Sequence, residues 1–221
     1  MQKTYEIHLV GATALLMHSD NITWAEVMKR WRLDPENKKL STPGDDRTPA
    51  WTWMGSMYHD GDMVGIPSDN LMTAIREGAS RVDTGKRGAT FKRQSQSGIV
   101  VNEIMWPIVT PKGRVAWSDV EKLRDVDDFF EHETAAAKLG FELLSKRAKV
   151  GMAKHVRVRP RFAAWEATGT VTVFDETITS QVMEMIWTNA GRYAGLGDWR
   201  PSSPKSPGPW GTFTATVKEL K

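Results

Sequence analysis

The sequence contains no cysteine among its 221 residues. This absence excludes thiol catalysis, thiolate zinc sites, iron–sulfur clusters and disulfide frameworks. The sequence also lacks a basic-then-apolar leader and any run of about 20 apolar residues that could cross a bilayer. We therefore expect a cytoplasmic protein with no membrane partner, and its length favours a single elaborated domain over 1–221.

Signatures of catalysis are also scarce. The five histidines are dispersed, with no HExxH pair, and neither a G-x-S-x-G elbow nor a G-x-x-x-x-G-K-(S/T) phosphate loop occurs. His59, Asp60 and Asp62 could hold a divalent ion in a nuclease, but a Gly/Asp turn beside a histidine is more often just a turn. We expect no enzymatic activity, no metal site and no cofactor.

The hydrophobic pattern indicates six core elements and three inserted segments. Tyr5, Ile7 and Leu9 alternate with polar residues, as in a half-buried strand, and Thr179 or Ser180 can cap a late helix. Ser68 or Asp69 can cap an earlier helix. The core elements are a strand at 4–10, a strand-to-helix unit at 64–82, an apolar run at 99–109, a bent strand or hairpin at 154–174, a helix after 179 and a strand at 212–220. The inserted segments are an irregular Trp/Pro-rich excursion at 18–62 with a short helix near 23–32, a basic loop at 83–97 and a helical insertion at 117–150.

The order strand, helix, strand, repeated once, is that of an α+β protein with a ferredoxin-like (RRM-like, split βαβ) core. The Trp-rich excursion and the helical insertion would extend that core.

Two stretches carry a family resemblance. GIPSDNLMTAIREGA resembles the strand-to-helix element of the repeat-associated mysterious protein (RAMP) superfamily, and AGLGDWRPSSPKSPGPWGTFTATV is similar to its late glycine-rich loop and last strand. The loop has more proline and less glycine than is usual there. Members of this superfamily bind guide RNA in CRISPR effector complexes, so the resemblance implies an RNA-binding backbone subunit in head-to-tail multimers. GLGDWRP before a short strand also resembles small proteins of bacterial viruses, which suggests a phage or mobile-element source.

The net charge of +3 is too small to indicate a polyanion partner by itself, so the distribution of charge matters more. A tract from Lys146 to Arg161 holds seven cations and no acid. Cations at alternating strand positions, such as Arg157 and Arg159, project from one sheet face and could follow a phosphate backbone. The alternative is a solvated face paired with the acidic segment 119–133.

Two other segments could contact nucleic acid. The 83–97 loop combines four cations with Phe91, which suits phosphate contacts and one base stack, although a solvated loop would have the same composition. The Pro-rich loop after 195 could hold Trp199, Arg200 and Trp210 for stacking, or fold the tryptophans over the core. The candidate nucleic-acid-binding residues are Lys86, Arg87, Lys92, Arg93, Lys154, Arg157, Arg159, Arg161, Trp199 and Arg200.

The leading hypothesis is a non-enzymatic subunit that binds single-stranded nucleic acid, RNA rather than DNA, within a homo-oligomer or filament. The alternative is a phage-encoded inhibitor or assembly protein that grips a protein partner with its Trp-rich and acidic surfaces, since the chain has ten tryptophans and only three tyrosines. A metal-dependent nuclease is a third hypothesis. Salt distinguishes the first two, because nucleic-acid affinity falls steeply with ionic strength.

Overall fold

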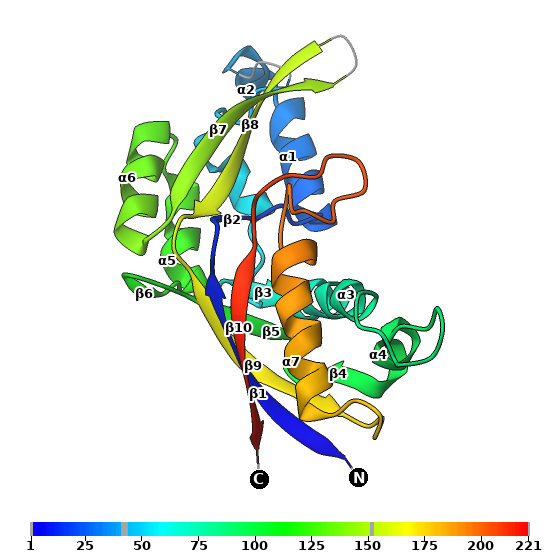
Figure 1. Ribbon diagram of the computed structural model, residues 1–221. Helices are drawn as coiled ribbons and strands as arrows, with labels where there is room; N and C mark the ends of the chain where they lie inside the picture. Colours follow the sequence, from blue (N-terminus) through cyan, green and yellow to red (C-terminus); the bar gives the residue numbers. More distant parts are fainter. Residues whose placement is uncertain (1, 41–43, 151–152, 221) are drawn as a thin grey trace.

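The computed structural model describes residues 2–40, 44–150 and 153–220, except for the side chains of 148–150 and 153–154 (Figure 1). It is an α+β protein with two antiparallel sheets. The strands are β1 (Lys3–Gly11), β2 (Leu15–Leu16), β3 (Gly65–Pro67), β4 (Ile99–Val101), β5 (Met105–Thr110), β6 (Gly113–Arg114), β7 (Glu142–Val150), β8 (Ala153–Phe162), β9 (Glu166–Val173) and β10 (Phe213–Leu220). The helices are α1 (Ile22–Leu33), α2 (Pro35–Leu40), α3 (Ser68–Ala79), α4 (Lys92–Gly98), α5 (Trp117–Glu121), α6 (Phe129–Leu139) and α7 (Ser180–Asn189), with 3₁₀ turns at Ala50–Ser56 and Lys122–Asp125 and a π-turn at Ala190–Ala194.

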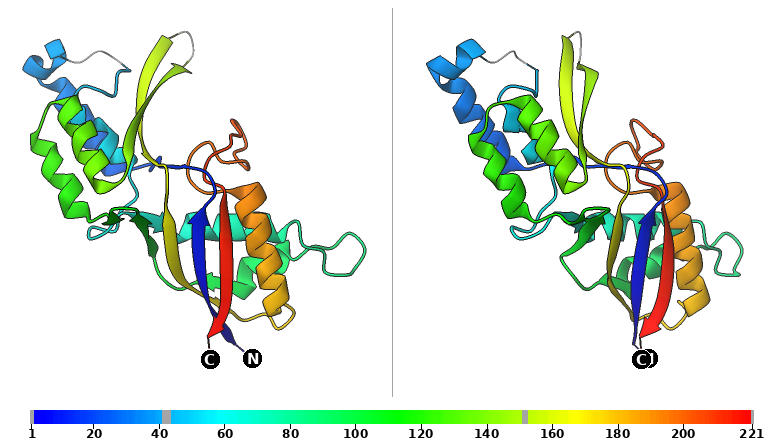
Figure 2. Two further views of the ribbon diagram at one scale, coloured as in Figure 1. Left: turned by 60° about the vertical axis from the view of Figure 1, so that its left-hand side comes forward. Right: turned by 90° about the vertical axis from the view of Figure 1, so that its left-hand side faces the viewer.

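The larger sheet is built on β1. Its strand order is β10-β1-β9-β5-β3, with β4 also paired to β9 and β6 to β5. The alternation predicted for the first strand is confirmed, because Tyr5, Ile7 and Leu9 are fully buried. The helices α3 and α7 contact each other, and α7 lies along β10 (Figures 1 and 2). This buried face of the sheet therefore belongs to the main core.

The two principal helices form where the pattern predicts them, with differences at their ends and faces. The hydroxyl of Thr179 accepts a hydrogen bond from the Val182 N–H, as expected of a cap, whereas Pro67 precedes α3 in place of a Ser68 or Asp69 cap. Met185, although apolar, is 41% exposed. Trp187 is buried instead, because its ring packs 5.9 Å from that of Trp106 and sets the rotation of α7.

The smaller sheet has the order β2-β8-β7. Its strand β7 lies in the segment 117–150, which the sequence predicts to be a helical insertion, so that prediction is wrong for the end of the segment. That segment is helical only as far as Leu139, and Gly140 ends α6 in a left-handed conformation with φ of 89°. Beyond it Phe141 and Leu143 are buried at alternate positions, so 142–150 forms a strand. The bent strand or hairpin predicted at 154–174 is two strands in different sheets, and Pro160 lies within β8, opposite Leu143.

Two of the predicted irregular segments are more regular than expected. The excursion at 18–62 contains α1, α2 and a 3₁₀ turn, and Trp51 and Trp53 within that turn are buried. The basic loop at 83–97 is a loop only until Phe91, where α4 begins. Within the described ranges, no helix is long and apolar enough to span a membrane.

Candidate nucleic-acid interface

The β7–β8 hairpin places cations on one of its two faces. Lys146 lies opposite Arg157, and Glu142 lies opposite Arg161, so these side chains share a face with Arg159. Side chains on one face of a strand recur about every 6.7 Å, which is comparable to the spacing of phosphates along a single strand. Val158, on the other face, is fully buried, so the expected placement of the arginines together on one face of the strand is present.

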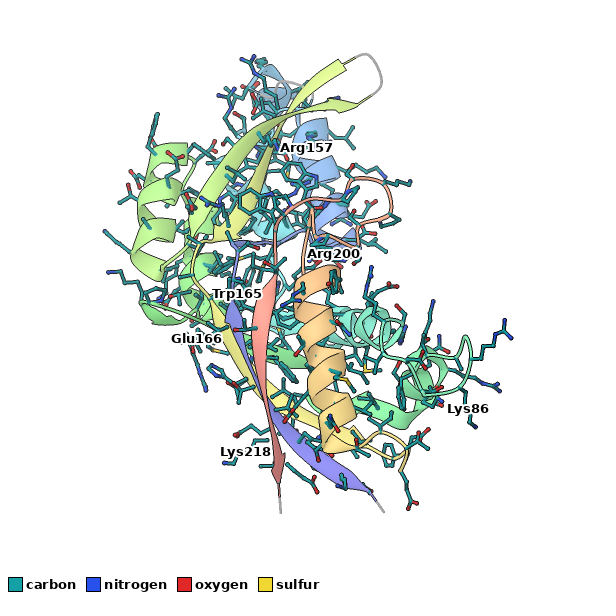
Figure 3. All side chains as sticks on the ribbon, in the orientation of Figure 1. Lys86, Arg157, Trp165, Glu166, Arg200 and Lys218 are labelled. Atoms are coloured by element: carbon teal, nitrogen blue, oxygen red, sulfur yellow. The ribbon has the colours of Figure 1, made fainter. Side chains whose placement is uncertain are left out.

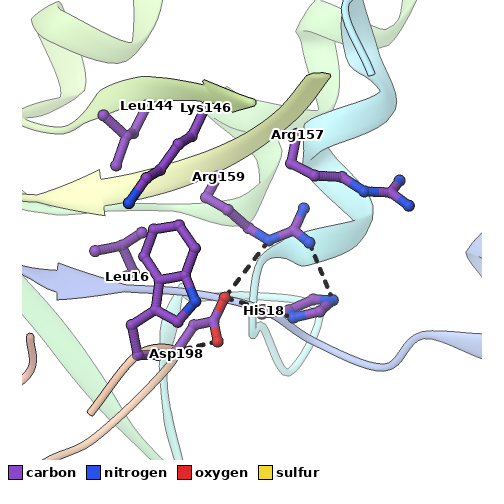
Figure 4. A pocket seen from close by; sticks show the side chains of 8 residues that line it. Leu16, His18, Leu144, Lys146, Arg157, Arg159 and Asp198 are labelled. Atoms are coloured by element: carbon purple, nitrogen blue, oxygen red, sulfur yellow. Dashed lines mark hydrogen bonds and ion pairs between the residues drawn. The ribbon is translucent and has the colours of Figure 1, made fainter. Parts of the chain in front are cut away.

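A cavity of about 240 Å³ opens on the cationic face (Figure 4). Three separate parts of the chain build it: β2 with the residues after it, the hairpin, and the loop that follows α7. Its lining is Leu16, His18, Leu144, Lys146, Arg157, Arg159, Asp198 and Trp199. We define these eight residues as the hairpin pocket.

The loop that follows α7 is held tightly against β2. The Asp198 N–H donates to the Leu16 carbonyl at 2.9 Å, and a Cβ at Gly197 would lie 2.2 Å from that same oxygen. Only glycine fits this approach, which fixes the next two side chains in the pocket wall. Trp199 has a φ of 50°, a left-handed conformation that costs a bulky residue about 1–2 kcal/mol. Surrounding contacts therefore hold Trp199 in a backbone conformation that is unfavourable for a bulky residue.

Arg159 is the charged centre of the hairpin pocket. Its side chain is 15% exposed, and its Nη2 lies 3.3 Å from Nε2 of His18. Its Nε lies 3.8 Å from Oδ2 of Asp198, and Nη1 lies 3.7 Å from Oδ2 of Asp46. Burial lowers the pKa of Arg159, and the two carboxylates partly offset that effect. Arginine ionises at so high a pH that the group stays charged near neutrality.

Asp198 remains a carboxylate for a related reason. Burial would raise its pKa, but the contacts with His18, the backbone N–H of Trp199 and Arg159 outweigh burial and lower the pKa below its usual range. Its Oδ1 accepts the Trp199 N–H at 3.0 Å, and its Oδ2 lies 3.6 Å from Nδ1 of His18. The pocket therefore presents an anionic group next to a cationic one.

The other two arginines of this face each pair with a carboxylate. Arg157 is 37% exposed and pairs with Asp46 at 3.0 Å. Arg161 pairs with Glu142, and its guanidinium lies 5.1 Å from the Trp210 ring centroid. These carboxylates do not belong to the acidic segment 119–133, so the alternative of a face paired with that segment does not hold at Arg157 and Arg161. In that segment Asp127 accepts the Ala50 N–H and Asp128 caps α6 instead.

Lys146 is the most accessible cation at the pocket. Its side chain is exposed, and its Nζ lies 3.9 Å from the centroid of the Trp199 ring. A second groove of about 420 Å³ adjoins the pocket and shares His18, Arg157 and Arg159 with it. The groove continues along α1, where Arg32 lines it. The groove also carries the carboxylates of Asp20 and Asp46, so a strand that leaves the pocket would meet charges of both signs.

The second basic tract lies elsewhere on the molecule. Lys86 lies on a turn far from Arg157 (Figure 3). Lys86 and Arg87 are exposed on that turn, and Lys92 and Arg93 are exposed on α4. Phe91 is buried to 6% exposure, so it is not available to stack on a base and that expectation is wrong. Among the side chains that the structure describes, Lys86 of this tract lies far from Arg157 of the hairpin (Figure 3).

The side chain of Arg200 is described by the structure, whereas that of Lys154 is not. Arg200 lies at the base of the late loop and donates to the Gly197 carbonyl at 3.0 Å and to the Ser202 hydroxyl at 3.2 Å, so it is engaged within its own loop. The side chain of Lys154 lies outside the described residues. Sequence reasoning overlooked His18 and Asp198, because each reaches the pocket from a segment with no local signal of charge clustering, and it overlooked Asp46, which pairs with Arg157.

Most of the tryptophans stabilise the interior. Six of the ten are buried, namely Trp51, Trp53, Trp106, Trp117, Trp165 and Trp187.

Residues 58–62 (YHDGD), considered above as a candidate metal site, form a turn. Oδ1 of Asp60 accepts the N–H groups of Asp62 and Met63, and His59 stacks on Trp117. Among the residues that the structure describes, no three His, Asp or Glu side chains gather as metal ligands would.

A scan against protein-family models and a search of curated proteins both find no match to this chain. The assignment of a function therefore rests on the geometry of the hairpin pocket and on the short motifs of the sequence.

Proposed function

We propose that this protein binds single-stranded RNA along the cationic face of the β7–β8 hairpin and acts without catalysis, as one subunit of an assembly. One observation carries the proposal: Lys146, Arg157 and Arg159 line a single cavity whose wall is the indole of Trp199. Nucleic-acid strands bind where cations follow the phosphates and aromatic rings stack on the bases. Both kinds of group occur together here.

The shape of the site favours a single strand. A concave cavity can accept a base only after that base has left a stacked duplex, which is how proteins read single-stranded loops and ends of RNA. The four cations on the hairpin face, Lys146, Arg157, Arg159 and Arg161, exceed by one the three carboxylates that pair with them, Asp46, Glu142 and Asp198. This surplus supports binding of a polyanion.

The proposed core is ferredoxin-like. Support comes from the antiparallel order β10-β1-β9-β4, with α3 between β1 and β4 along the chain and α7 between β9 and β10. A split βαβ repeat places its strands and helices in this way. In the part of the chain that the structure describes, the middle of the open sheet face carries the His8–Glu166 pair, in which a carboxylate accompanies the imidazole. RNA would therefore bind at the hairpin of the smaller sheet.

The assembly would be a head-to-tail multimer, as in the guide-RNA backbone subunits that the short motifs resemble. Ile104 and Phe130 are 83% and 77% exposed, and such side chains are suited to subunit contacts. Heterologous contacts between copies produce filaments when they do not close into a ring.

The test is the salt dependence of RNA binding, measured by fluorescence anisotropy with a labelled 20-nucleotide RNA. We expect the double variant Lys146→Gln/Arg157→Gln to bind about tenfold more weakly. The slope of log affinity against log salt should also fall by about 1.4, because each lost contact to a single strand removes about 0.7.

The matched control is Lys86→Gln/Arg87→Gln, which removes the same charge from the distant turn. It should bind nearly as tightly as the wild type. The proposal is wrong if the wild type binds neither RNA nor single-stranded DNA, or if both double variants weaken binding equally.

A further inference from the structure

We infer that the hairpin pocket is a binding site for one unstacked guanine base. The inference rests on the proposed function and adds sequence preference to it. The cavity of about 240 Å³ is smaller than the roughly 300 Å³ at which pockets for whole drug-sized ligands begin. Its size suits one planar base, with the sugar and phosphate left outside.

The walls and the mouth match such a base. Leu16 and Leu144 supply apolar surface (Figure 4). The Trp199 indole supplies an aromatic wall. Lys146 and Arg157 stand at the accessible side, where the phosphates next to an inserted base would lie. Base–aromatic stacking contributes binding energy for any base, so these features alone do not select among the four.

The polar groups at the edge of the pocket can distinguish among the four bases. Oδ2 of Asp198 lies 3.6 Å from His18 and 3.8 Å from Arg159, both longer than a hydrogen bond, so it can still accept. Its other oxygen already accepts the Trp199 N–H. Nη1 of Arg159 is committed to Ser56 and to the Val158 carbonyl, whereas Nε faces Asp198 across that longer gap. The pocket thus offers a hydrogen-bond acceptor, Oδ2 of Asp198, beside a donor, Nε of Arg159.

Guanine offers the best complement to this pair. Its Watson–Crick edge presents O6 as an acceptor beside two donors, N1–H and N2–H₂. Each carboxylate oxygen has two lone pairs, so Asp198 can accept from both donors while it keeps the Trp199 N–H, and the Arg159 guanidinium can donate to O6. Adenine and cytosine present one amino group beside an acceptor, and uracil presents one N–H between two acceptors. Because hydrogen bonds to ionised groups are about twice as strong as neutral ones, the additional bond favours guanine.

The experiment compares four labelled nine-nucleotide RNAs that differ only at the central position, where uridine is replaced by guanosine, adenosine or inosine. We expect the wild type to bind the guanosine RNA about tenfold more tightly than the all-uridine RNA, since a bidentate contact to a base discriminates by about 1–3 kcal/mol. The inosine RNA should fall between them, because inosine lacks the N2 amine.

Asp198→Asn should bring the four affinities within about threefold of one another. The amide oxygen can still accept the Trp199 N–H, so the loop should keep its fold, which a thermal melt checks. Asp69→Asn makes the same change at an exposed position on α3 and should retain the preference.

The outcomes separate the two proposals. Equal, salt-sensitive binding of all four RNAs by the wild type overturns the guanine pocket and leaves RNA binding intact. A preference for adenosine, or a guanosine preference that survives in Asp198→Asn, also overturns the pocket. A wild type that binds none of the four overturns the proposed function, and the pocket with it.

Discussion

Glu103 shows how a single carboxylate can organise the larger sheet. Its two oxygens accept the Thr170 N–H at 2.9 and 3.1 Å, the Thr170 hydroxyl at 2.7 Å and the Trp106 indole N–H at 2.8 Å. Burial would raise the pKa of Glu103, but these hydrogen bonds outweigh burial and lower it below 4.5. A lowered pKa means that the stabilisation is complete above about pH 4.5 and is lost as the pH falls through the folded-state pKa.

We expect Glu103→Gln to lower the free energy of unfolding by about 1–2 kcal/mol at pH 7, because the charge-assisted bonds become neutral ones. Urea denaturation at pH 7 and at pH 3 should show that the difference from the wild type shrinks at the lower pH. Glu184→Gln, at an exposed position on α7, should change the stability by less than about 0.5 kcal/mol. A difference for Glu103→Gln that persists unchanged at pH 3 would contradict this account.

Among the elements, the crossing of α3 and α7 depends on glycine. A Cβ at Gly78 would lie 2.3 Å from the Ile186 carbonyl oxygen and 2.8 Å from the Ala190 nitrogen, both backbone atoms that cannot move aside cheaply. The same constraint appears after α7, where a Cβ at Gly191 would lie 2.0 Å from the Phe213 carbonyl oxygen. Glycine thus sets how closely the helices approach each other and β10.

We expect Gly78→Ala to destabilise the protein by about 1–3 kcal/mol, the usual range for forcing extra atoms into a packed core. This is the opposite of its effect in an isolated helix, where alanine is favoured over glycine by about 1 kcal/mol. Thr73→Ala, on the exposed side of α3, is the control and should be neutral or slightly stabilising. If thermal unfolding shows Gly78→Ala to be the more stable protein, the close crossing is not present in solution.

At the scale of the whole molecule, Trp165 joins the two sheets. It lies where the chain passes from β8 to β9, beside the segment that leads from β1 to β2 (Figure 3). Its indole N–H donates to the Thr13 carbonyl at 2.9 Å, and its own carbonyl accepts the Gly11 N–H at 2.8 Å. One cluster of buried apolar residues includes Ile7 of the larger sheet and Val158 of the hairpin. We expect the two sheets to unfold together.

Trp165→Phe tests this coupling, because it keeps an aromatic ring and removes the indole donor. Hydrogen exchange should show the amides of β1 and of β8 losing the same 1–3 kcal/mol or so of protection, as in a single cooperative unit. The wild type, in which both sets of amides should report one free energy of opening, is the reference. Loss of protection confined to β8 would mean that the hairpin opens independently of the larger sheet.

The sequence alone determined those features that depend on neighbours along the chain. Side-chain alternation located β1 and separated Val158 from the arginines of β8, and the cap at Thr179 located α7. These signals are local because strand alternation and helix caps involve residues only a few positions apart. They were not sufficient at 142–150, where good helix formers follow Gly140 and the pairing with β8 imposes a strand.

The tertiary structure alone decided the partners of the cations. Arg157 pairs with Asp46 from 111 positions away, and Arg159 meets His18 from 141 positions away. The approach of Asp198 depends on the contact between Gly197 and β2. Segments so distant in sequence meet only because the core brings them together, and no local pattern of charge or hydrophobicity records which acid will face which base.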